Sequence, residues 1–114
     1  MRPLPLIALL ACDPVPPACP ALCAEAAAAL SPCVEAQGLS WSAYGYEDQA
    51  DFQDACDTWA WEQARMAQHA SARQGGGGQG LHALEARCVD LSETFATGTC
   101  EEQLSVRWGD EAWR

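Results

Sequence analysis

Lysine and asparagine are missing from the 114-residue sequence, and the only isoleucine is Ile7. Alanine, in contrast, fills about one position in five, and it favours helices because it loses no side-chain entropy there. Apolar residues make up 49% of the chain and charged residues 19%, which is typical of a globular protein and argues against disorder. The length suffices for one domain with a modest core.

Basic residues are also scarce. The chain has 6 arginines against 16 acidic residues, and its formal net charge is −10. The phosphates of nucleic acids and anionic lipid headgroups repel such a chain. We therefore expect no nucleic-acid partner, and we interpret the acidity mainly as a source of solubility.

Cysteine is the most informative residue type. Seven cysteines in so short a chain indicate an oxidising compartment and a framework of disulfides. Because seven is an odd number, one cysteine requires a separate role.

The N-terminus supplies a candidate for that role. Arg2 precedes an apolar run over residues 4–11. This run is too short to span a membrane, which takes about 20 residues, but it fits the apolar region of a signal peptide. The segment from Leu9 to Cys12, Leu-Leu-Ala-Cys, resembles the lipobox of bacterial lipoprotein precursors. The resemblance implies that residues 1–11 are a signal peptide and that Cys12 carries a thioether-linked lipid as the first mature residue.

Six cysteines then remain, enough for three disulfides: Cys19, Cys23, Cys33, Cys56, Cys88 and Cys100. Residues 12–18 are expected to be the lipidated cysteine and a stiff Pro-rich tether. Residues 19–108 are expected to form a helical, disulfide-rich domain, and residues 109–114 a loose tail. The mature protein would lie in the bacterial cell envelope, membrane-anchored and extracytoplasmic, at the inner or the outer membrane. The alternative is a secreted protein without a lipid.

The spacing of apolar residues predicts an all-α fold, a small three- to four-helix bundle stapled by three disulfides. The first helix is expected over residues 20–30, because Pro32 disfavours helical backbone at Ser31. A short turn then ends at Gly38. Residues 39–47 are expected to form an aromatic connector without a long regular element.

The second helix is expected over residues 48–73, with Asp48 as its N-cap. Its inner face is predicted from the three- and four-residue spacing of Phe52, Cys56, Trp59, Gln63, Met66 and Ala70. A flexible turn over residues 74–80, with four consecutive glycines, should follow.

The third helix is expected over residues 81–96, with an inner face of Leu81, Leu84, Cys88, Leu91 and Phe95. Gly98 should end this helix. Thr99 and Glu102 have the spacing of a capping box that opens a short fourth helix. Leu104 and Trp108 would lie on the inner face of that helix.

An antiparallel hairpin about the glycine turn predicts the disulfide pairing. Cys56 and Cys100 would lie nearly level, whereas Cys56 and Cys88 would be offset by about 15 Å along the helices, too far for a disulfide. Cys56–Cys100 is therefore expected. Cys88 must then reach the first helix, where we choose Cys23 over Cys19 as its partner, and Cys19–Cys33 is left by elimination.

Trp41, Tyr44 and Tyr46 on the connector are the candidate binding surface, for a protein or glycan partner. Aromatic residues in such a place can equally cover the open edge of a small helical core. The sequence leaves both interpretations open.

His69 and His82 flank the glycine turn, with Glu85 one turn beyond His82, and they are a conceivable metal site. We favour two solvated histidines at helix ends and expect no metal. An acidic run at the start of the second helix comprises Glu47, Asp48, Asp51, Asp54 and Asp57. Steps of three residues drift around a helix by about 60° each, so these carboxylates are expected to form a solvated face.

No catalytic motif stands out, neither a nucleophile elbow nor His-Glu-x-x-His, so we expect no catalytic residues and no cofactor. The predicted function is a lipid-anchored extracytoplasmic binding or structural domain without catalytic activity. Two alternatives differ in class. One is a secreted disulfide-rich inhibitor or toxin-like module, and the other is a metal-dependent enzyme that uses His69 and His82.

Overall fold

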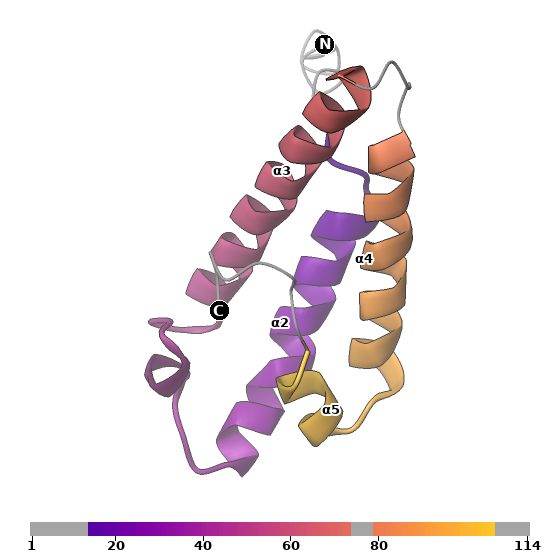
Figure 1. The fold of residues 1–114 in the computed structure, drawn as a ribbon. Helices are drawn as coiled ribbons and strands as arrows, with labels where there is room; N and C mark the ends of the chain where they lie inside the picture. The colour runs from indigo at the N-terminus through magenta and orange to yellow at the C-terminus, as the bar shows by residue number, and fades with distance from the viewer. Residues whose placement is uncertain (1–13, 74–78, 107–114) are drawn as a thin grey trace, which may run out of the picture.

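The computed structural model describes residues 14–73 and 79–106, although not the side chains of residues 70–73 and 79. The elements are α2 (Ala18–Ala36), the 3-10 turn η1 (Trp41–Tyr44), α3 (Gln49–Arg73), α4 (Gln79–Thr97) and α5 (Cys100–Leu104). Figure 1 shows α2, α3 and α4 packed side by side, with the short α5 across the end where α2 and α4 finish. This arrangement confirms the all-α bundle; the part of the chain that the structure describes contains no strand.

Helix α2 is longer than the sequence predicts. It begins at Ala18 and continues through Pro32 to Ala36, so the expected break at Ser31-Pro32 is wrong. Pro32 removes one helical N–H and costs about 3 kcal/mol. The residues that follow it offset this cost, because Cys33 and Val34 are almost fully buried. Gly38, with φ +71°, ends the segment where the sequence predicts.

The residues before α2 are partly packed. Val15 and Ala18 lie against the hydrophobic core, so the Pro-rich stretch is not wholly separate from the domain. Residues 1–13 lie outside the described residues, and the predicted signal peptide and lipidated Cys12 lie there with them.

Helix α3 begins at Gln49, one residue after the predicted start, and Asp48 caps it. The Asp48 side chain accepts a hydrogen bond from the Asp51 backbone N–H at 2.8 Å. The predicted inner face is confirmed for Phe52, Cys56 and Trp59, which are all buried.

The second half of that inner face is different. Met66 is 56% exposed, and Ala60 and Ala64 are buried in its place. The Cys23–Cys56 disulfide sets the register of α2 and α3 and accounts for the exposure of Met66, although not for the burial of Ala64. Ala18 lies five residues before Cys23, so α3 passes the start of α2 about five residues after Cys56 and continues without that neighbour. Met66 is therefore not covered by α2.

Helix α4 follows the prediction closely. Leu84, Cys88 and Phe95 are buried, while Leu81 and Leu91 are partly buried against the same core. The capping box of Thr99 and Glu102 is present at the start of α5. Trp108, the tail over residues 109–114 and the glycines at 75–78 lie outside the described residues.

The predicted disulfide pairing is wrong in all three bridges, although the six cysteines are the expected ones. The bridges are Cys19–Cys88, Cys23–Cys56 and Cys33–Cys100. Each has one end on α2, because α2 packs against α3, α4 and α5. Because α2 is unbroken, its first and third cysteines lie about 21 Å apart along one helix and cannot pair. None of the described helices is both long enough and apolar enough to cross a membrane.

Candidate functional site

The connector folds back on α3 through an aromatic cluster, which consists of Trp41, Tyr46 and Phe52. The Trp41 and Phe52 ring centroids are 5.3 Å apart, and Tyr46 meets Phe52 edge-on at the same distance. Gly45 permits the reversal, with φ +94°, and the Tyr46 N–H donates to the Trp41 carbonyl at 3.2 Å. The cluster therefore closes one edge of the helical core, as one of the two interpretations of these aromatics requires.

The same residues also line a cavity of about 150 Å³. It lies between the end of α2, the connector, the start of α3 and the end of α5. Its lining is Leu30, Val34, Trp41, Tyr44, Tyr46, Phe52, Gln103, Leu104 and Val106. All three aromatic residues singled out in the sequence are thus brought to one site. The residues that α2 and α5 contribute to the cavity wall could not be predicted from the sequence. They come together only because α2 continues past Pro32.

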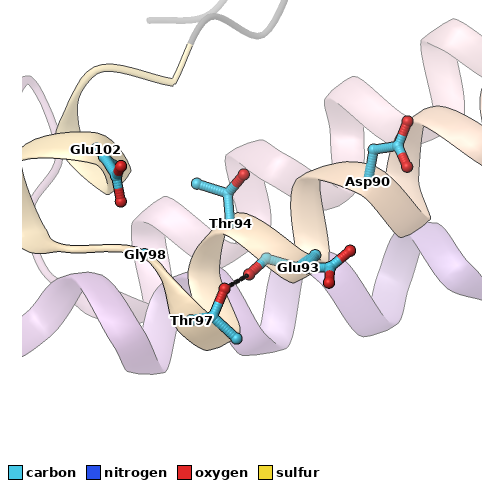
Figure 2. A pocket seen from close by; sticks show the side chains of 6 residues that line it. All are labelled: Asp90, Glu93, Thr94, Thr97, Gly98 and Glu102. Carbon is cyan, nitrogen blue, oxygen red and sulfur yellow. Dashed lines mark hydrogen bonds between the residues drawn. The ribbon is translucent and has the colours of Figure 1, made fainter.

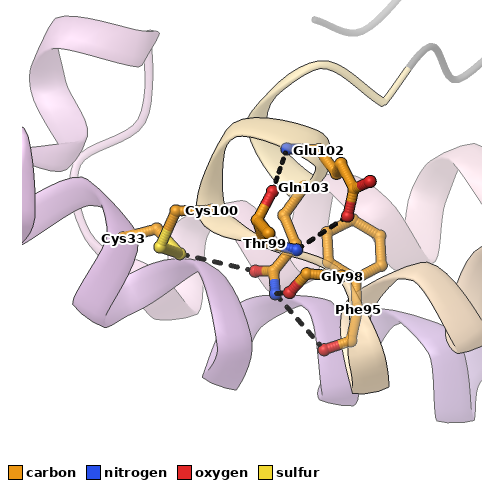
Figure 3. The surroundings of a disulfide bond; sticks show 7 residues. All are labelled: Cys33, Phe95, Gly98, Thr99, Cys100, Glu102 and Gln103. Atoms are coloured by element: carbon orange, nitrogen blue, oxygen red, sulfur yellow. Dashed lines mark hydrogen bonds between the residues drawn. A yellow bond between two sulfur atoms is a disulfide. The ribbon is translucent and has the colours of Figure 1, made fainter.

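Gln103 is the polar side chain on the buried side of this cavity and is 9% exposed. Its amide nitrogen donates to the Gly98 carbonyl at 3.0 Å and lies 3.5 Å from the Phe95 carbonyl (Figure 3). Its Oε1 lies 3.5 Å from Cys33 Sγ. That sulfur is in a disulfide with Cys100 and carries no hydrogen, so it donates nothing. Two carbonyls thus fix the orientation of the amide, and its oxygen remains an acceptor.

The chemistry of the lining is simple. Among the described residues of the lining, the titratable ones are Tyr44 and Tyr46. The remaining groups are aliphatic, aromatic or amide. Such a wall can bind an apolar group, and its described residues include no carboxylate or imidazole.

A larger hollow, of about 380 Å³, lies on the outer side of α4 and is more open to solvent. Figure 2 shows its lining, which includes the carboxylates of Asp90 and Glu93 on α4 and of Glu102 on α5, and these do not converge. Glu102 is already occupied, because its Oε1 accepts the Thr99 N–H at 2.8 Å. We therefore place the candidate site at the aromatic cavity.

Charge divides the molecule into two parts. The parts of α3 and α4 that extend beyond the start of α2 (Figure 1) are residues 62–73 and 79–87, and we call them the hairpin tip. We call the other described residues the body. The tip has 3 arginines and 2 acidic residues. The body has no arginine and 11 acidic residues: Glu25, Glu35, Glu47, Asp48, Asp51, Asp54, Asp57, Asp90, Glu93, Glu101 and Glu102.

Two interactions reflect this division. Desolvation raises the pKa of Asp57 above its usual value, and the neighbouring Asp54 carboxylate raises it further. In the tip, the Arg65 guanidinium lies 4.8 Å from the centre of the Trp61 ring, and the Arg87 guanidinium lies 5.7 Å from that of Trp59. The body is thus under mutual repulsion of carboxylates, while two arginines of the tip are held against aromatic rings.

The two histidines lie in the tip, His69 on α3 and His82 on α4, and both are exposed. Within residues 14–73 and 79–106, no group of three or more His, Cys, Asp and Glu side chains could hold a metal ion. In the acidic run at the start of α3, Asp48 and Asp51 accept backbone N–H groups. No protein-family model, curated protein or solved structure matches the chain.

Proposed function

We propose that this chain is the precursor of a bacterial lipoprotein, and that its mature part is a lipid-anchored, extracytoplasmic binding domain without catalytic activity. The arrangement of the cysteines carries the proposal. Three disulfides use six of the seven, and the seventh, Cys12, follows Leu-Leu-Ala in the segment that resembles a lipobox. Disulfides persist in oxidising compartments outside the cytoplasm.

The aromatic cavity supports binding as the role of the domain. Pockets for drug-sized molecules have volumes of roughly 300–1,000 Å³, whereas this cavity has about 150 Å³. A macromolecular partner that inserts one group suits that size better than a small-molecule substrate does. The scarcity of titratable groups on the wall favours binding over acid–base chemistry.

The division of charge supports a particular orientation at the membrane. Residues 14–17 and the start of α2 lie on the side of the hairpin tip, so a chain tethered through Cys12 would hold the tip near the lipid. Anionic headgroups would attract the arginines of the tip and repel the acidic body. The cavity, at the far end of α2, would then face away from the membrane.

The anchor is tested by Cys12→Ala in cells of the natural host. We expect the variant to lose its association with membranes and to retain three disulfides and the helical circular-dichroism spectrum, because Cys12 belongs to no bridge. Met66→Ala, at an exposed position of the mature domain, is the matched control and should fractionate as the wild type does. A Cys12→Ala variant that still pellets with membranes would show that the anchor is wrongly assigned. Wild-type protein in the medium without lipid would favour the secreted alternative.

A further inference from the structure

We infer that the aromatic cavity accepts one apolar side chain from a positively charged segment of a partner protein. The inference rests on the proposed binding function and adds the chemistry of the partner. Two observations carry it: the volume of the cavity and the charge around it.

The volume limits the group that can enter. An apolar cavity of about 150 Å³ holds a benzene molecule, and this cavity has that volume, so it suits one leucine or phenylalanine side chain. The aromatic rings do not form a cage for a quaternary ammonium ion. Trp41, Tyr46 and Phe52 lie 5.3–6.4 Å from one another, centre to centre, and therefore pack together instead of surrounding a cation.

The charge around the cavity favours a cationic segment. Two residues of the lining, Val34 and Tyr46, are each followed directly by an exposed glutamate, Glu35 and Glu47. Both carboxylates are exposed, and screening of their attraction for a cation in physiological salt takes effect over about 8 Å. The body contains 11 acidic residues and no arginine, while Arg107, which follows Val106, lies outside the described residues. Lysine or arginine beside the inserted side chain would be attracted to the acidic body.

A polypeptide also suits the site better than a glycan. A sugar ring stacks on an open aromatic face, whereas the three rings of the aromatic cluster contact one another. An acidic glycan would in addition be repelled by the body.

The test is an NMR titration of the full mature domain, labelled with ¹⁵N, at low salt. The probe is the peptide acetyl-Lys-Lys-Gly-Leu-Gly-Lys-Lys-amide. We expect it to shift the signals of the Trp41 indole and of residues 44–46. Replacing its leucine by serine should weaken binding about tenfold, the loss that one buried leucine side chain represents. Replacing its lysines by glutamates, or adding 0.5 M sodium chloride, should weaken binding by a similar factor.

Variants of the protein give the second arm. Tyr44→Ala opens the wall of the cavity without removing a ring of the aromatic cluster and should abolish the effect of the leucine. Glu35→Gln and Glu47→Gln, at exposed positions that leave the fold unchanged, should each weaken the lysine peptide two- to threefold at low salt. Glu62→Gln, in the hairpin tip, is the matched control and should bind as the wild type does.

Four results would overturn the inference. One is equal binding of the lysine and glutamate peptides, or of the leucine and serine peptides. Another is that chitotriose shifts the cavity signals and the peptides do not. A third is a concentration-dependent shift without peptide, which would show a second copy of the chain in the cavity. The fourth is that Trp108→Ala alone shifts the same signals, which would show that the chain fills its own cavity. None of these results bears on the anchor, which the Cys12 variant tests separately.

Discussion

Trp59 and Trp61 lie two residues apart on α3 in opposite surroundings. Trp59 is 3% exposed and Trp61 45%, as expected from their positions on the helix. We predict that Trp59→Ala lowers the free energy of unfolding by roughly 3–5 kcal/mol, as for other large buried aromatics. Trp61→Ala should cost much less, on the order of 1 kcal/mol, because it removes chiefly the contact with Arg65. Urea denaturation measures both changes, and equal losses would contradict the assignment of the inner face.

Individual residues could be predicted from the sequence where local spacing decides their environment. Phe52, Cys56 and Trp59 follow the helical period and are buried, and the Thr99–Glu102 capping box needs only four consecutive residues. The exposure of Met66 could not be predicted from local spacing, because it depends on where a different helix, α2, begins. The same limit applies to Gln103 in the cavity wall, whose role depends on residues brought together from α2 and α4.

Helix α2 is the element on which the rest of the fold depends. All three disulfides start on it, and Pro32 lies inside it. A general preference of proline to end helices predicts a break, and tertiary packing of Cys33 and Val34 overrides that preference. The wrong pairing of the cysteines has the same origin, since a helix that ended at residue 30 would free Cys33 to fold back towards Cys19.

Pro32→Ala tests this account of α2. The substitution restores an N–H that can donate to the Ala28 carbonyl, and we predict that it raises the free energy of unfolding by roughly 1–3 kcal/mol, net of the greater freedom of the unfolded chain. Pro20→Ala is the matched control, because position 20 lies in the first turn of α2, where a helical N–H has no carbonyl partner. No gain from Pro32→Ala over Pro20→Ala in urea denaturation would show that α2 does not continue through residue 32.

The whole molecule combines a rigid bundle with an uneven charge. The disulfides fix how α2, α3 and α4 lie against one another. Once this register is known, the charges of the body and of the hairpin tip can be counted from the sequence. The sequence alone suggested only solubility, because the spatial separation of the three described arginines from 11 of the acidic residues requires the extension of α3 and α4 beyond α2. This separation gives the proposed anchor a preferred orientation and leaves the aromatic cavity at the opposite end.

Mass spectrometry of the intact mature protein, extracted from membranes in detergent without a reducing agent, tests the central claim most directly. The account predicts a chain that begins at Cys12, carries the mass of a diacylglyceryl group on that residue, and gains no alkylating label until its three disulfides are reduced. A mature chain with an unmodified Cys12, or one that begins at another residue, would contradict the account.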